Sequence, residues 1–521
     1  MTSLPPMSNA GLLRWAWRQL TSMKTALILL FLLALASVPG SLLPQRGIDP
    51  IKVRLFLTEN PTWGPILDRS GFFDVYSSPW FSAVYLLLFV SLVGCVLPRV
   101  GVHFRAMRSA PPAAPRMLQR FSGTRTLQAT APTAEVLDTA EEALRSARWR
   151  VVRGPVEGAT WLSAEKGYLR ETGNLIFHLS LLVVIVSIAF GGLFGWKGNV
   201  IVREGSGFSN TLTQYDAWGG GRFVNAAEMP PFSFTLDKFT ADFERGTVER
   251  GSPRAFEAEV SYRTEPSAPL QRTLIEVNEP LVINGAKVFL VGHGYAPIIT
   301  VTDRTGAVVF DDAVPFLPQD GNSTSTGVVK IPDSNPQLGI RGLFLPTVKL
   351  DQVLGPISIF PAPDDPALFM SAWEGDLGLE SGTPQSIYRL VTEKMTQIGL
   401  EQLRPGQTWT LPKGAGTVSF AGYERWASFQ IAADPGKEIA LFSAAAAILG
   451  LTMSLFIRRR RVWVKVVERD GVTVVQLTGI MRTSTFEDQD IGALAEDLDL
   501  VEQALVADGQ ALHPAPSEEE S

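Results

Sequence analysis

Four long apolar blocks alternate with polar stretches along this chain. They are Thr25–Leu43, Phe81–Leu97, Thr172–Trp196 and Ile439–Ile457. Each is close to the roughly 20 residues that a helix needs to cross the hydrocarbon core of a bilayer. Lys24 precedes the first block as in a signal peptide, but the apolar stretch is long and no clear cleavage site follows it. We interpret it as a retained anchor, and the pattern predicts four transmembrane helices.

Basic residues cluster at one end of each block. The clusters are Arg14, Arg18 and Lys24; Arg99, Arg105, Arg108, Arg116 and Arg120; Lys166 and Arg170; and Arg458, Arg459, Arg460, Arg461 and Lys465. Because cytoplasmic loops carry an excess of Lys and Arg, all four clusters are cytoplasmic together only if both termini are inside. Buried helices of a soluble protein would not explain this agreement.

The predicted topology is that of a multi-pass protein of the cell membrane. Its segments are a cytoplasmic N-terminus (1–24), transmembrane helices (25–43, 80–98, 172–196 and 438–457), an extracytoplasmic loop (44–79), a cytoplasmic linker and small α+β unit (99–171), a β-rich extracytoplasmic domain (197–437), and a cytoplasmic hairpin, helix and disordered tail (458–521). We expect the loop to form short helices on the membrane surface. The net charge of −6 gives no reason to expect a nucleic-acid partner.

Alternating apolar and polar residues predict strands in the large domain. Segments 231–239, 255–263, 272–278 and 287–295 alternate in this way, and 299–310 reads as a hairpin. Repeated short strands with turn signals favour an antiparallel sandwich or an open barrel. The stretch Ala367–Leu400 is expected to be a helical insertion.

The cytoplasmic segments predict smaller elements. A Pro/Ala-rich linker (109–117) precedes a strand, an amphipathic helix and two more strands, which together indicate a small α+β unit. After the fourth block we expect a hairpin through Asp470-Gly471 and an acidic helix. The tail from His513 is expected to be disordered.

His178 is the only ionisable side chain in the apolar run Thr172–Trp196. An imidazole in hydrocarbon is costly, so it indicates a functional site, offering a proton to move or a lone pair for a metal such as haem iron. The structural alternative is a neutral imidazole that donates to a carbonyl or to a hydroxyl such as that of Ser180. These residues alone leave both interpretations open. A haem entering from inside, with its propionates near Lys166 and Arg170, could place iron at this depth.

The other candidate residues give weaker signals. His293 lies between two glycines, which permit close approach of a flat ligand but also suit a polar residue at a bulge or bend. His103 follows the second block, where we expect a solvated polar face. Cys95 is the only cysteine, so the chain forms no internal disulfide, and we interpret it as a packing residue.

Several short motifs together point to a known family. They are Leu20–Ala26, Val38–Gln45, Phe73–Phe81, Leu92–Cys95, Gly173–Leu179, Val277–Leu281, Gly292–Pro297 and Asp434–Gly436. With these motifs the chain resembles the ResB (CcsB) proteins of system II cytochrome c biogenesis, from about Leu20 to the C-terminal hairpin.

The resemblance implies a function. Such proteins work with a ResC (CcsA) partner in haem export and in joining haem b to an apocytochrome c, with a thioredoxin-like thiol reductant as a further partner. The resemblance maps a proposed intramembrane haem ligand onto His178. The family's tryptophan-rich haem-handling signature belongs to the partner and is not found here, which implies an accessory subunit without synthase activity of its own.

Two other classes of function compete with this one. The chain could be a membrane sensor or scaffold whose outer β domain binds a ligand or partner. A secondary transporter is disfavoured, because four spans with one ionisable residue provide neither an inverted repeat nor an ion site.

Overall fold

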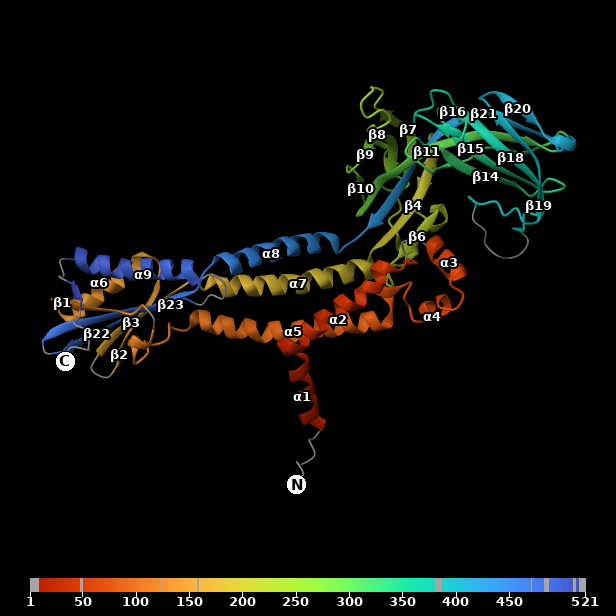
Figure 1. Ribbon diagram of the computed structural model, residues 1–521. Helices are drawn as coiled ribbons and strands as arrows, with labels where there is room; N and C mark the ends of the chain where they lie inside the picture. The colour runs from red at the N-terminus through yellow and green to blue at the C-terminus, as the bar shows by residue number, and fades with distance from the viewer. Residues whose placement is uncertain are drawn as a thin grey trace. The chain divides into compact units, whose positions relative to one another are not determined.

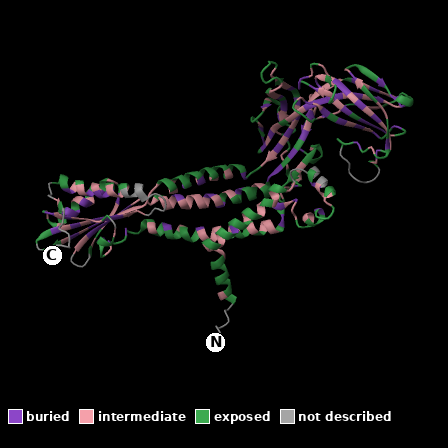
Figure 2. Cartoon of the chain, in the orientation of Figure 1, coloured by how far each residue is buried: buried purple, intermediate pink, exposed green. Residues whose placement is uncertain are grey.

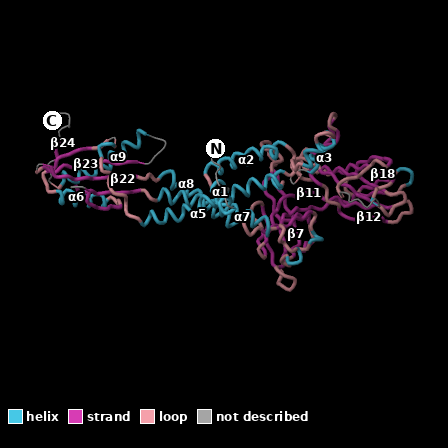
Figure 3. The backbone as a smooth tube through the Cα atoms, turned by 90° about the horizontal axis from the view of Figure 1, so that it is seen from below, coloured by secondary structure: helices cyan, strands magenta, loops and turns pink. Residues whose placement is uncertain are grey.

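A computed structural model of the chain describes residues 9–46, 50–121, 123–156, 159–379, 387–469, 471–481, 487–508 and 512–514. The chain forms two compact units. The first contains Met1–Ser187 and Glu438–Ser521, and the second contains Ile188–Lys437. The first unit holds most of the helices and one sheet, whereas the second is built mainly of strands (Figures 1 and 3).

Four long helices coincide with the four apolar blocks. They are α2 (Met23–Leu42), α5 (Pro79–Arg108), α7 (Leu169–Phe194) and α8 (Lys437–Phe456). By length and composition all four could cross a membrane, and only 11–17% of the residues in their most apolar windows are buried inside the structure. Figure 2 shows this exposure along the helices. Exposed apolar surface of this extent is typical of helices that face lipid or another protein.

Helix α5 is longer than predicted. It continues to Arg108, past the expected end at residue 98, and includes Pro98 within the helix. The basic residues that follow the apolar block favour a helix as strongly as apolar ones do, so the change in polarity does not end it. The helix stops at Ser109, just before two prolines.

A break in the chain separates α1 (Asn9–Leu20) from α2. The hydroxyl of Ser22 caps α2 by accepting from the backbone N–H of Thr25 at 3.2 Å. The carbonyls left at the end of α1 accept from α5, that of Leu20 from the hydroxyl of Ser91 at 2.6 Å and that of Thr21 from the thiol of Cys95 at 2.7 Å. Helix-end carbonyls need such partners in apolar surroundings. Cys95 therefore has a structural hydrogen bond.

Helices α7 and α8 approach closely at two glycines. A Cβ atom added to Gly173 would lie 2.7 Å from the carbonyl oxygen of Gly450, and one added to Gly450 would lie 2.7 Å from the carbonyl oxygen of Gly173. Small residues permit this backbone contact between apolar helices. The loop between α2 and α5 contains the helices α3 (Pro50–Glu59) and α4 (Gly64–Arg69), as predicted.

One antiparallel sheet in the first unit joins distant parts of the chain. Its order is β2-β3-β22-β23-β1-β24. The strands are β1 (Arg125–Ala129), β2 (Arg150–Val156), β3 (Ala159–Lys166), β22 (Arg460–Arg469), β23 (Val472–Met481) and β24 (Leu512–Pro514). From the sequence, 99–171 and 458–521 were predicted as separate cytoplasmic segments, but β3 pairs directly with β22. An alternating pattern reveals a strand without revealing its partner.

Both faces of this sheet are covered. The helices α6 (Thr133–Ser146) and α9 (Glu487–Ala507) pack on one face through side chains such as Leu137 and Val501. The Pro/Ala-rich linker lies on the other, where Ala114 packs with Trp161 and Trp463. The prediction of a disordered tail is wrong for its first residues, because β24 pairs with β1. Residues 515–521 lie outside the described residues.

The described residues of the second unit form eighteen strands in antiparallel pairings. They are β4 (Trp196–Arg203), β5 (Gly207–Ser209), β6 (Ala217–Gly220), β7 (Ser233–Phe243), β8 (Pro253–Arg263), β9 (Gln271–Glu276), β10 (Leu281–Ile283), β11 (Ala286–Thr302), β12 (Val308–Ala313), β13 (Leu317–Pro318), β14 (Ser325–Ile331), β15 (Leu338–Leu345), β16 (Val348–Asp351), β17 (Gly355–Ser358), β18 (Ala367–Gly375), β19 (Met395–Leu403), β20 (Gln407–Thr410) and β21 (Thr417–Ala433). The predicted antiparallel β architecture is confirmed.

Two sandwiches share the long strands β11 and β21. One packs the sheet β10-β11-β21-β4-β6 against β5-β7-β8-β9, with Phe234 and Phe429 in its core. The other packs the remaining lengths of β11 and β21 against β13-β14-β15-β18-β19, with Phe344 and Phe420 in its core. The middle of β11 is therefore the joint between two hydrophobic cores.

The expected helical insertion at Ala367–Leu400 is wrong. Strands β18 and β19 occupy its described ends and pair antiparallel. Leu368, Met370 and Ala372 alternate toward the core, so their burial has period two. The segment is rich in helix-favouring residues, and tertiary packing overrides that weak preference. Residues 380–386 lie outside the described residues.

The charge clusters and the shared sheet generate a prediction about topology. A fusion of alkaline phosphatase at Gly321 should be active outside, and green fluorescent protein fused at Ala507 should fluoresce inside, because the positive clusters predict that both termini are cytoplasmic. Enzyme activity and fluorescence in intact cells are the measurements. Exchanging the two reporters is the control and should silence both; reporters that place both sites on one side would contradict the topology.

Candidate functional site

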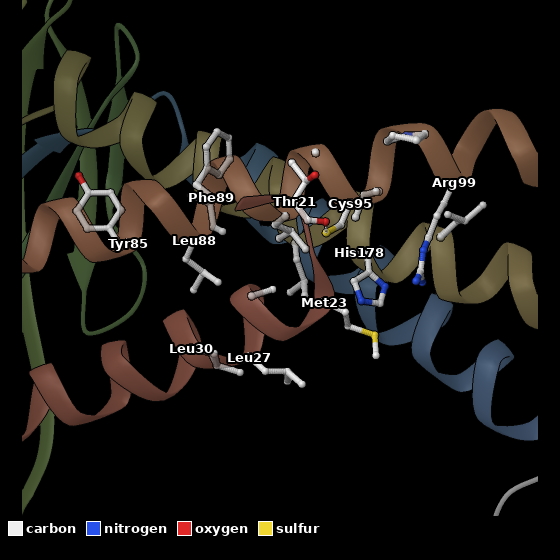
Figure 4. A pocket seen from close by; sticks show the side chains of 18 of the residues that line it. Thr21, Met23, Leu27, Leu30, Tyr85, Leu88, Phe89, Cys95, Arg99 and His178 are labelled. Carbon is white, nitrogen blue, oxygen red and sulfur yellow. Dashed lines mark hydrogen bonds between the residues drawn. The ribbon is translucent and has the colours of Figure 1, made fainter. Parts of the chain in front are cut away.

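Helices α2, α5 and α7 line an apolar cavity in the first unit. Its volume is about 720 Å³, within the range of roughly 300–1,000 Å³ that is common for sites of small molecules and cofactors. The walls are mostly aliphatic, with Leu27 and Leu30 from α2, Leu88 from α5 and Leu181 from α7. Figure 4 shows these helices around the cavity. Such a space favours a large apolar ligand.

Polar side chains gather at one end of this cavity. Cys95 and Arg99 come from α5, and Asn174 and His178 come from α7. Figure 4 shows Arg99 and His178 at the same end, whereas Tyr85 lies at the opposite end. Each pair of positions is four residues apart, so each occupies successive turns of one helix face. The cavity is therefore amphipathic along its length.

The imidazole of His178 has a defined orientation. Its Nδ1 lies 2.8 Å from the backbone carbonyl oxygen of Asn174, one turn earlier in α7. A carbonyl oxygen only accepts, so Nδ1 must carry the proton, and in a neutral ring Nε2 then holds a lone pair. The ring of Phe177 packs edge-on at 5.1 Å between centroids. Thus one nitrogen orients the ring and the other can bind an electrophile.

This geometry bears on the structural alternative for His178. The bond to Asn174 lies within α7, so it does not tie α7 to another helix. Within the described parts of the chain no hydrogen bond reaches Nε2. Donation from Nδ1 to a carbonyl, the structural alternative for His178, is therefore compatible with ligand binding at Nε2.

The cavity is also lined by a cation, Arg99, which the sequence did not single out as a site residue. Lys166 and Arg170 were expected at the level of the ligand's propionates, but neither lines the cavity. Lys166 instead donates to the carbonyl of Ala147 at 3.0 Å. Arg99 is instead the cation that lines the cavity. Its spacing of one helical turn after Cys95 was the available signal, once α5 is known to continue past residue 98.

The expectation that His103 lies on a solvated face is wrong. Its side chain is 8% exposed. Nε2 lies 3.0 Å from the hydroxyl of Thr172, and Nδ1 lies 3.6 Å from a carboxylate oxygen of Glu171. Because α5 continues as a helix, His103 comes to lie against the first turn of α7 and links the two helices.

A buried carboxylate fixes the start of α7 and the end of α8. Glu165 is 1% exposed and accepts from the hydroxyl of Tyr168 and from the guanidinium of Arg459, while Arg461 lies 3.2 Å away. Burial alone would raise the pKa of Glu165, but these donors hold it below its ordinary value. Arg459 also pairs with Glu171 of α7. The network therefore anchors the first turn of α7, the helix that carries His178.

His293 lies in the second unit, at the joint of the two sandwiches. Its ring packs against Phe239 at 5.4 Å, Phe256 at 4.6 Å and Phe243 at 6.1 Å between centroids. The register of β11 shifts between Leu290 and Gly292, so a β-bulge adjoins His293. This agrees with the interpretation of His293 as a polar residue at a bulge or bend. Burial, with a smaller effect of Arg425, lowers the pKa of His293 to about 4.

The flanking residues of His293 also serve packing. A Cβ atom on Gly294 would lie 2.4 Å from the indole of Trp426, whose Nε1 donates to the carbonyl of Tyr295 at 3.1 Å. The hydroxyl of Tyr295 donates to the carbonyl of Pro361 at 2.8 Å. Among the described residues no group of three or more His, Cys, Asp or Glu is placed to hold a metal ion. A ligand role for His293 stays a prediction.

Comparison with known proteins supplies independent information. The sequence profile of the ResB-like family matches residues 23–490. The chain is similar to Cytochrome c biogenesis protein CcsB of Gloeobacter violaceus, with 24% identity over 476 residues that cover 88% of this chain and 85% of that protein. It is 26% identical to CcsB of Thermosynechococcus vestitus over 300 residues, which cover 56% and 63%. Cytochrome c biogenesis protein Ccs1 of Rhodomonas salina is 23% identical over 270 residues, covering 51% and 57%.

The aromatic surroundings of His293 generate a prediction about pH. Its pKa is lowered from 6.5 to about 4 in the folded chain. Below pH 6.5 the unfolded chain therefore binds a proton that the folded chain excludes, and stability falls as the pH drops toward 4. His293→Phe should lose less stability than the wild type between pH 7 and pH 5.

Thermal unfolding of the full-length protein in detergent, followed by tryptophan fluorescence, is the measurement. His513→Phe changes an exposed histidine in the first unit and serves as the matched control. An equal pH dependence in the wild type and in His293→Phe would refute the neutral, packed role of His293.

Proposed function

The chain belongs to the ResB-like family, and we propose that it acts in cytochrome c maturation as a membrane subunit that delivers haem. The relatives named Cytochrome c biogenesis protein CcsB support this process. The observation that carries the proposal is the imidazole of His178, which presents an Nε2 lone pair in a cavity of about 720 Å³. Haem b is the cargo of this cavity rather than a resident cofactor.

The chemistry of the cavity fits haem. Aliphatic walls suit a flat apolar macrocycle, and a neutral imidazole whose other nitrogen is held by a carbonyl is a common iron ligand. The described part of the cavity wall holds no second histidine. His178 would hold the haem iron in this cavity, and a ResC (CcsA)-type partner would supply any further ligand. In this proposal the partner also attaches haem to apocytochrome c, whose thiols a thioredoxin-like reductant keeps reduced.

The proposed topology places the four helices across the membrane with both termini in the cytoplasm. Strands β1 to β3 precede α7 and β22 to β24 follow α8, yet they form one sheet. Segments on the two sides of a pair of crossing helices must then lie on the same side of the membrane. The basic clusters assign that side to the cytoplasm, which leaves the second unit outside.

In this proposal the second unit docks the apocytochrome. Strands β9 and β10 are outer strands of two sheets, and exposed apolar side chains follow this edge at Leu270, Leu274, Val277 and Val282. An edge strand can bind an extended peptide by backbone pairing. A photocrosslinker at Leu274 should capture an apocytochrome peptide, and one at the exposed Val308 of β12 should not. Capture of the partner protein alone would make this edge structural.

The central prediction concerns His178. His178→Gly leaves a hole of the size of an imidazole and should abolish cytochrome c maturation, because the iron ligand is lost. Added imidazole should restore part of the maturation by filling the ligand position. Haem staining of mature cytochrome c in cells, with the variant present at the wild-type level in the membrane, is the measurement.

Two further variants sharpen this test. His178→Asn keeps a hydrogen-bonding side chain but loses the strong iron ligand, so it should fail as well. His103→Asn changes the other histidine of the long helices, which contacts Thr172 and does not line the cavity. Any loss of maturation that it causes should follow its level in the membrane, and added imidazole should not restore it. Normal maturation in His178→Asn would show that the residue does not bind iron.

A further inference from the structure

Arg99 is a cation at the polar end of a cavity whose walls are mostly aliphatic. It extends from α5 one turn after Cys95 and lines the cavity together with His178 (Figure 4). Its side chain is exposed, and across the chain segments that the structure describes no carboxylate pairs with it. Ionisable residues in apolar helices usually pair with one another or mark the path of a ligand.

Neighbouring arginines on α5 have partners within the protein. The Nε of Arg105 donates to the carbonyl of Gly101 at 3.2 Å, and the guanidinium of Arg108 lies 4.9 Å from the ring centroid of Phe104. Neither lines the cavity. Arg99 thus differs from them in both respects, since it faces the cavity and has its donors available for a ligand.

We propose that Arg99 binds a carboxylate of the haem and thereby sets the orientation in which the cavity accepts it. The inference rests on the proposed function. A guanidinium presents a planar fork of N–H donors that matches a carboxylate, and the amide of Asn174 at the same end can add a further donor. The iron then faces Nε2 of His178, and the carboxylate edge lies toward the end of α5 that carries the basic cluster.

This arrangement explains why one end of the cavity is polar. The carboxylates of an amphipathic macrocycle remain charged and need a donor or water, whereas the ring needs the aliphatic walls. Arg99 meets the first need at the exposed end, and the leucines of the three helices meet the second. Haem therefore enters with its apolar edge first, from the side that the topology assigns to the cytoplasm.

The test compares two probes that differ only in their carboxylates. Ferric protoporphyrin IX and its dimethyl ester are titrated into the purified full-length protein in detergent, and binding is followed by absorbance. Arg99→Gln should bind the free acid about tenfold more weakly, the effect expected for loss of a charge-assisted hydrogen bond, and should bind the ester as the wild type does. Arg99→Lys should keep part of the preference, and Arg105→Gln is the matched control.

The absorbance spectrum of the bound haem distinguishes iron binding by His178 from carboxylate binding by Arg99. Arg99→Gln should keep the spectrum of the wild-type complex, because His178 still binds the iron. Equal affinity of Arg99→Gln and Arg105→Gln for the free acid would overturn the inference, as would an equal loss for both probes. If the wild type binds neither probe, both the proposed function and the role of Arg99 are wrong. If His178→Asn binds both probes with the affinity and spectrum of the wild type while Arg99→Gln loses affinity for the free acid, His178 is not the iron ligand and the role of Arg99 stands.

Discussion

Polar groups in apolar helices must find their partners within the protein, and the helical part of this chain depends on that constraint. At the break between α1 and α2, Ser91 and Cys95 donate to the backbone carbonyls of Leu20 and Thr21, which would otherwise lack a partner within these helices. Glycines at the contact of α7 and α8 let the two backbones approach with their own hydrogen bonds intact. The buried Glu165 similarly satisfies Arg459 and Arg461 where the helices meet the sheet.

The same constraint makes the exceptions informative. The Nδ1 atom of His178 is satisfied within its own helix, but within the described structure Nε2 is not, and neither is the guanidinium of Arg99. Both groups line one cavity. A lone pair and a cation at one end of an apolar space are complementary to a metal and a carboxylate on one apolar body. Haem has a metal, carboxylates and an apolar ring. Haem as the ligand agrees with the name of the relatives, Cytochrome c biogenesis protein CcsB.

Sequence patterns predicted those features that depend on a single segment. The four apolar helices and the alternation of strands such as β7 and β8 were visible because they follow from local periodicity. His178 stood out because one polar residue interrupts a long apolar run. Pairings between distant segments, such as β3 with β22, were not visible. The misplacement of His103 and the omission of Arg99 share one cause, since both depend on α5 continuing past the apolar block.

The most direct test of the account measures the nitrogen bound to iron. Pulsed electron paramagnetic resonance of the full-length protein loaded with ferric haem, prepared with and without ¹⁵N-labelled histidine, detects coupling between the iron spin and an imidazole nitrogen. The wild type should show a histidine nitrogen coupling that changes with the label, and His178→Asn should lack it. Bound haem without that coupling, or the same coupling in the variant, would contradict the claim that His178 presents Nε2 to the iron.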